Sequence, residues 1–190
     1  MARLLRDQGY TATGLAQVLA ESGVSNGSLY HHFPGGMEEL AQAALETSGQ
    51  AIADALSRVL DDAPSTGEGI AVFLDIVEVS ADGICRGCPI SPTALESSVS
   101  PRLRTAATRC FNKWEDLLAG RLRADGWPDE DVPQAASAAL SLIEGALLLA
   151  RVTGQISHLA NAKQAARALF TAAPAQQAPT KVVRKSRTPR

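Results

Sequence analysis

Apolar residues recur at helical spacing along most of this chain, and no stretch shows the strict alternation of apolar and polar residues that a half-buried strand requires. Glycine and proline divide the helical pattern into segments. The pattern predicts helices over about residues 2–8, a helix–turn–helix over about 14–32, and further helices over about 37–62, 68–82, 92–98, 101–125, 131–153 and 156–172. We therefore expect an all-α protein.

The stretch from Thr13 to Leu40, TGLAQVLAESGVSNGSLYHHFPGGMEEL, has the pattern of a helix–turn–helix with a short second helix. Gly23-Val24-Ser25 supplies the turn, and Ser25 is a favourable N-cap for the helix that follows. The positions expected to face inward are Leu15, Val18 and Leu19 on the first helix, with Val24, Leu29 and Phe33 around the second. Asn26, Ser28, Tyr30 and His31 are left facing outward, and such side chains suit a recognition helix in a major groove.

This stretch resembles the DNA-binding domain of the Tet-repressor family of bacterial transcription regulators, most closely at GVSNGSLYHHF, Gly23 to Phe33. The resemblance implies double-stranded operator DNA as a partner. It also implies a set of candidate DNA-contacting residues: Thr13, Gln17, Ser25, Asn26, Gly27, Ser28, Tyr30, His31 and His32. Within this set Asn26, Ser28 and His31 are expected to face base edges, whereas Tyr30, Thr13 and Gln17 are expected at the sugar–phosphate backbone.

The distribution of charged residues gives less support to a DNA-binding role than the helix–turn–helix motif does. The net charge is −2, and the first 62 residues hold eight acidic side chains against three basic ones. The family pattern expects a basic arm and a longer first helix, into which this chain begins partway, and a lysine at the position of Met37. A helical ligand-binding protein with impaired DNA binding is therefore an alternative function.

The second half carries GCPISPTALES, from Gly87 to Ser97, which resembles the regulatory domain of the lincomycin-resistance repressor and its relatives. That resemblance implies a C-terminal domain that binds a small effector, often aromatic, and a repressor that the effector releases from DNA. The implied effector-pocket residues are Phe73, Ile76, Val77, Cys88, Phe111, Trp114, Leu118 and Glu144. For most of the apolar ones a plain core position is the alternative. The expected mechanism is a tilt of the helix after Met37, which changes the separation of two recognition helices.

The expected helix over 131–153 is apolar on more than one side. One apolar side of this helix suits the core of the chain. The second apolar side predicts contact with another helix, in this chain or in a partner. The resembled family pairs its last two long helices across a two-fold axis, so we expect a homodimer through 131–153 and 156–172, with burial in a monomer core as the alternative. The expected domains are 1–45 for DNA binding, 46–172 for effector binding and dimerisation, and a disordered basic tail over 173–190.

The three cysteines and three histidines raise two further alternatives. Cys85 and Cys88 form a CxxC motif, typical of a thiol redox pair or half of a metal site, which Cys110 and His158 could complete only if folding brought them together. No P-loop, GxSxG, GxGxxG or HExxH motif is present, so we expect no enzyme, cofactor or metal. No signal-peptide pattern or uninterrupted apolar run predicts a membrane partner, and the expected location is the cytoplasm.

Overall fold

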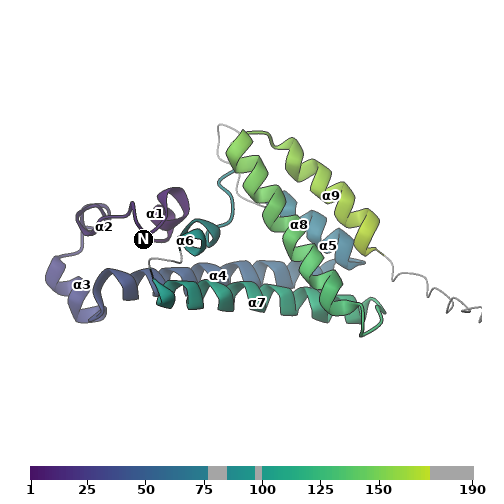
Figure 1. The fold of residues 1–190 in the computed structure, drawn as a ribbon, viewed down its shortest axis with the longest axis horizontal. Helices are drawn as coiled ribbons and strands as arrows, with labels where there is room; N and C mark the ends of the chain where they lie inside the picture. Colours follow the sequence, from purple (N-terminus) through teal and green to yellow (C-terminus); the bar gives the residue numbers. More distant parts are fainter. Residues whose placement is uncertain (77–84, 97–99, 172–190) are drawn as a thin grey trace, which may run out of the picture.

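The computed structural model describes residues 1–76, 85–96 and 100–171, and helices form nearly all of its regular structure (Figure 1). The helices are α1 (Ala2–Gln8), α2 (Leu15–Ser22), α3 (Asn26–His32), α4 (Gly36–Asp62), α5 (Thr66–Ile76), α6 (Ser91–Leu95), α7 (Pro101–Ala124), α8 (Val132–Thr153) and α9 (Ser157–Phe170). The all-α prediction is confirmed, with helix bounds close to those expected. Residues 77–82 of the helix expected over 68–82 lie outside the described residues, as does the tail over 173–190.

Two long helices form the axis of the molecule. α4 and α7 lie side by side, and α1, α2 and α3 gather near the end of the pair where α4 begins (Figure 1). α5, α8 and α9 pack together near the other end, and the short α6 lies beside α1. Because α4 continues without interruption through residues 45 and 46, one helix joins the two domains expected from the sequence.

The apolar face of α4 explains its packing on α7. Leu45, Leu56 and Leu60 are almost fully buried, at helical spacing on the side that faces the core. Trp114 of α7 is buried against this face, and its Nε1 donates a 3.0 Å hydrogen bond to the carbonyl oxygen of Gly49 in α4. The pair of helices is therefore fixed in register by a polar contact within an apolar interface.

The end of α4 and the start of α5 are held by polar side chains at the C-terminal end of α7, Arg121 and the capping residue Asp125. The carboxylate of Asp125 accepts hydrogen bonds from the Thr66 backbone nitrogen and hydroxyl, at 2.6 and 2.7 Å. Arg121 forms a 2.8 Å ion pair with the same carboxylate and donates to the carbonyl oxygens of Leu60 and Ala63. These contacts fix the angle between α4 and α5, two of the helices that enclose the cavity described below.

α8 is, within the described residues, the one helix long and apolar enough to cross a membrane by length and composition alone. Core helices of proteins without a membrane span pass the same test. Its buried residues pack against α7 and α9 and include Val132, Ala136, Ile143 and Leu147. Leu148, Leu149 and Val152 form a second apolar side and remain exposed. The two-sided pattern expected from the sequence is therefore present, and the outer side is uncovered in the single chain.

Candidate DNA-binding surface and effector cavity

The helix–turn–helix forms because its turn and cap suit the backbone. Gly23 ends α2 in the left-handed region, with φ of 68°, which an L side chain rarely adopts. Ser25 then caps α3, since its hydroxyl accepts a 3.1 Å hydrogen bond from the Ser28 backbone nitrogen. Val18 and Leu29 are buried as expected. The expectation for Val24 was wrong: it is 42 % exposed, because the turn carries its side chain away from the small interface.

The outer surface of α3 presents most of the residues expected to contact DNA. Asn26, Gly27, His31 and His32 are exposed, and Ser28 is half-buried. The rings of His31 and His32 meet edge to face, with centroids 5.1 Å apart. Tyr30 is 46 % exposed, so its hydroxyl is available to a phosphate. The short helix therefore offers hydrogen-bonding side chains without any lysine or arginine.

Two of the residues expected to contact DNA, Thr13 and Gln17, form hydrogen bonds with other residues of this chain. Thr13 is buried, and its hydroxyl donates a 2.6 Å hydrogen bond to the Gly9 carbonyl oxygen. Gln17 is half-buried; its side-chain oxygen accepts from Gln8 at 2.9 Å, and its side-chain nitrogen donates to Glu21 at 3.2 Å. In the free protein these two side chains therefore hold α2 against the end of α1.

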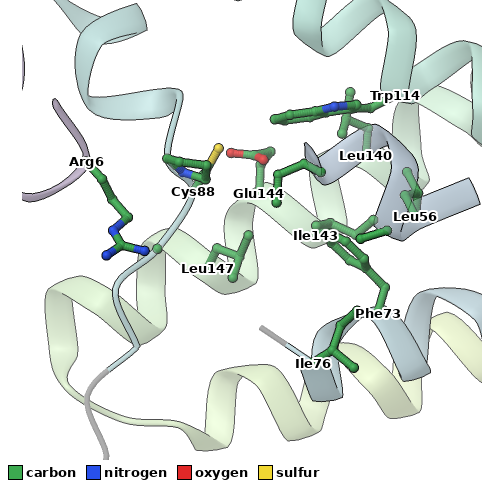
Figure 2. Close-up of a pocket in the computed structure, with 14 residues that line it drawn as sticks. Arg6, Leu56, Phe73, Ile76, Cys88, Trp114, Leu140, Ile143, Glu144 and Leu147 are labelled. Carbon is green, nitrogen blue, oxygen red and sulfur yellow. The ribbon is translucent and has the colours of Figure 1, made fainter. Parts of the chain in front are cut away.

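A cavity of about 210 Å³ lies between α4, α5, α7, α8 and the segment 87–89 (Figure 2). Five of the expected effector-pocket residues line it: Phe73, Ile76, Cys88, Trp114 and Glu144. Phe111 and Leu118 do not, and Val77 lies outside the described residues. Phe111 stacks edge to face on Trp114, with centroids 5.2 Å apart, while Leu118, one turn of α7 further on, is fully buried in the core.

The remaining lining residues were not expected from the sequence. They are Ile52, Ala55 and Leu56 of α4, Leu140, Ile143 and Leu147 of α8, Gly87 and Pro89 of the connecting segment, and Arg6 of α1. The apolar stripes of α4 and α8 contain several of these positions, but a stripe does not distinguish a cavity wall from a filled core. Arg6 is notable because it belongs to the DNA-binding end of the chain.

Glu144 is the acidic group of this cavity. Its Oε2 accepts a 2.7 Å hydrogen bond from the Ser91 hydroxyl, and the Cys88 thiol lies beside the carboxyl group (Figure 2). Burial raises the pKa of Glu144, an effect that the hydrogen bonds from Ser91 and Cys88 oppose. Burial and the neighbouring Glu144 raise the pKa of Cys88 to about 12. The site therefore combines a neutral thiol and a poorly hydrated carboxyl group in an apolar wall.

The surroundings of the cysteines give little support to the alternative of a thiol switch, in which the redox pair Cys85 and Cys88 would sense oxidants. Cys85, Cys88 and Cys110 are free and buried, and the described residues contain no group of three or more His, Cys, Asp or Glu side chains arranged to hold a metal ion. We expect iodoacetamide to label Cys88 at least about tenfold more slowly in the native protein near neutral pH than in urea, because the reactive thiolate is scarce at this pKa. Mass spectrometry of quenched samples measures this rate.

The thiol-switch alternative predicts the opposite result. Fast native labelling of Cys88 would support it, as would an oxidant response of DNA binding that is lost in Cys85→Ala. If Cys85→Ala left the oxidant response of DNA binding unchanged, the thiol switch would be excluded.

Two side chains, Arg151 and Glu96, join the end of α1 to the chain on either side of the cavity-lining residues 87–89. Arg151, near the end of α8, donates to the carbonyl oxygens of Arg6 at 2.7 Å, Asp7 at 2.9 Å and Arg86 at 3.2 Å. Glu96, at the end of α6, accepts from the backbone nitrogens of Tyr10 at 2.7 Å and Thr11 at 2.9 Å. The cavity wall and the helix–turn–helix are therefore linked through residues 6–11.

Comparison with known proteins assigns this architecture. Residues 2–44 match the model of the bacterial regulatory proteins of the tetR family, and residues 68–165 match the C-terminal domain of LmrA/YxaF-like transcriptional regulators. The chain belongs to the TetR family. It is a helix–turn–helix transcriptional regulator, and in this family repression, release by an effector, dimerisation and a cytoplasmic location are typical.

Relatives of this TetR-family chain extend over most of its length. It is 35 % identical to the HTH-type transcriptional regulator YxaF of Bacillus subtilis over 151 residues, which is 78 % of this chain and 79 % of YxaF. It is 35 % identical to LmrA of the same organism over 152 residues, covering 77 % and 80 %. A TetR regulator from Legionella pneumophila shares the fold with a TM-score of 0.77 at 24 % identity, covering 88 % of this chain and 91 % of that one.

Proposed function

We propose that this chain binds operator DNA as a homodimer through α3 and leaves the operator when a small molecule fills the cavity. The observation that carries the proposal is the two-sided character of α3. Leu29 is buried, whereas Asn26 and His31 are exposed on the same helix, which lies at one end of the molecule (Figure 1). The chain is a transcriptional regulator like its relatives, and we propose that it catalyses no reaction.

The uncovered apolar side of the C-terminal helices supports the homodimer. Large apolar side chains are exposed there: Leu148, Leu149, Val152, Ile156 and Leu169. Pairing this surface with a second copy would remove them from water and would present two α3 helices to successive major grooves, about 34–36 Å apart or a multiple of that. Sedimentation equilibrium of the native chain tests the proposed dimer.

The hydrogen bonds that Arg151 and Glu96 form near the end of α1 support a route from the cavity to α3. Gly87, Cys88 and Pro89 line the cavity, and Arg86 and Glu96 on either side of them contact Arg151 and residues 10–11. An effector that displaces this segment would move α1 and, through α1, the helix–turn–helix. This route acts together with the tilt of α4 expected from the sequence, because α4 also lines the cavity and follows α3 directly.

Replacing Asn26 with alanine is expected to weaken operator binding by about tenfold or more, since a bidentate amide–adenine contact contributes roughly 1–3 kcal/mol. Asn112→Ala is the matched control, because Asn112 is an exposed asparagine on α7, remote from α3. Fluorescence anisotropy with the DNA upstream of the gene, against a scrambled competitor, measures both. Equal affinities for the two variants would contradict the proposed orientation of α3.

A helical ligand-binding protein with impaired DNA binding is the second candidate. It is favoured by Met37 at the position where the family pattern has lysine, and by the shortage of basic residues: Arg3 and Arg6 are the only arginines among residues 1–44, which contain no lysine. Failure of the native chain to prefer any operator over scrambled DNA at low salt, while it still binds ligands in the cavity, would establish this candidate instead.

A further inference from the structure

The cavity is apolar apart from a few groups, and one of them is an acid on the core helix α8. Trp114, Phe73, Leu56 and Ile143 form apolar walls of the cavity that also holds the Glu144 carboxyl group (Figure 2). A carboxylate in such surroundings loses hydration that apolar neighbours do not replace. An acid at this position therefore has a cost for stability, which a bound ligand of suitable charge would offset.

Glu144 has no cationic partner in the described part of the chain. Its contacts there are the Ser91 hydroxyl, at 2.7 Å, and the Cys88 thiol, and no lysine, arginine or histidine pairs with it. Arg6, the other charged residue of the wall, forms an ion pair with Asp7, from Nε to Oδ1 at 3.5 Å. In Figure 2 the Cys88 side chain lies between Arg6 and Glu144. The carboxyl group thus faces the cavity without a counter-ion from residues 1–76, 85–96 or 100–171.

We propose that the cavity takes a compact primary amine with an apolar, ring-bearing body, and that the protonated nitrogen binds the Glu144 carboxylate. This inference rests on the proposed effector site and specifies its ligand. The volume, about 210 Å³, lies below the roughly 300 Å³ at the lower end of ligand pockets, so a single ring with a short chain fits better than a fused ring system.

Two physical effects select the amine over other compounds of the same shape. An ammonium group attracts the carboxylate as an opposite charge as well as donating a hydrogen bond to it, whereas an alcohol only donates the hydrogen bond, and the apolar walls keep screening water away. The Trp114 ring lines the same cavity as the carboxyl group, and the face of an indole ring attracts a cation. A carboxylic acid of the same shape would meet the Glu144 carboxylate as a like charge and bind worst.

Isothermal titration of the native chain with 2-phenylethylamine, 2-phenylethanol and phenylacetate near neutral pH tests the inference. We expect the amine to bind at least about tenfold more tightly than the alcohol, which corresponds to one charge-assisted hydrogen bond. In Glu144→Gln this preference should fall to about twofold or less, because the neutral amide forms no ion pair with the ammonium group. The amide retains an oxygen that accepts from Ser91, so the fold is expected to persist, as a thermal melt will verify.

Glu130→Gln is the matched control, since Glu130 is an exposed acid between α7 and α8, and it should retain the full preference for the amine. Equal binding of amine and alcohol by the native chain would overturn the inference, as would an unchanged preference in Glu144→Gln or binding of none of the three probes. Release of preformed protein–operator complex is measured alongside. Release by the alcohol and the amine alike would keep the proposed function and reject only the charge selectivity.

Discussion

Arg151→Ala is expected to lower the free energy of unfolding by about 2–4 kcal/mol and to weaken operator binding by about tenfold or more. The guanidinium donates to three carbonyl oxygens, and two of them, those of Arg6 and Asp7, belong to the last turn of α1. A helix leaves its final carbonyl groups without partners of its own, so this side chain completes them. Without it, α1 and the helix–turn–helix lose their attachment to α8. Urea denaturation and anisotropy with operator DNA measure the two effects.

Arg109→Ala is the control, because it removes an arginine that pairs with α4 rather than with α1. Arg109 is exposed on α7 and pairs with Glu46 at the surface, so its removal should change stability by no more than about 0.5–1 kcal/mol. If Arg151→Ala retained both the stability and the operator affinity of the native chain, the attachment of α1 would depend on other contacts. If Arg151→Ala bound the operator normally but no longer responded to an effector, Arg151 would act only in the route that connects the cavity to α3.

The helices could be predicted because their boundaries are local. Pro34-Gly35-Gly36 and Gly126-Trp127-Pro128 interrupt the apolar spacing, and the Ser25 cap contacts an amide only three residues away. The wrong expectation, for Val24, concerned a turn residue in a very small interface, where apolar character alone does not determine burial.

The site was predictable only in part because its remaining features join residues far apart in the chain. Arg151 and Arg6 are separated by 145 positions, and Glu96 and Tyr10 by 86. No spacing rule brings such pairs together before the tertiary structure is known. Phe111 and Trp114 share α7, yet only Trp114 reaches the cavity, because helix rotation decides which side chain forms the wall. The type of site could be inferred from the family resemblance, whereas most of its polar residues could be identified only from the tertiary structure.

Gly9→Ala is expected to destabilise the chain by about 2–4 kcal/mol through two separate effects. Gly9 ends α1 with φ of 78° and ψ of −177°, a conformation that is essentially restricted to glycine. A Cβ atom there would also lie 2.4 Å from Oε1 of Glu96, whose carboxylate holds the Tyr10 and Thr11 backbone nitrogens. Either the backbone or the carboxylate must shift, and both movements disturb the start of the helix–turn–helix. Thermal and urea unfolding, with operator anisotropy, measure the result.

Three variants separate the two effects. Gly120→Ala serves as the control, because Gly120 lies in α7 with open space at the Cβ position, and alanine there should stabilise the helix by about 0.5–1 kcal/mol. Glu96→Ala alone removes the carboxylate and should weaken operator binding by freeing residues 10–11. In the double variant, Gly9→Ala with Glu96→Ala, the clash is gone while the backbone strain remains, so its destabilisation should be smaller than the sum of the two single effects. Strict additivity would mean that Gly9 and Glu96 act independently, and the close contact between them would then have no energetic role in holding α1 to α6.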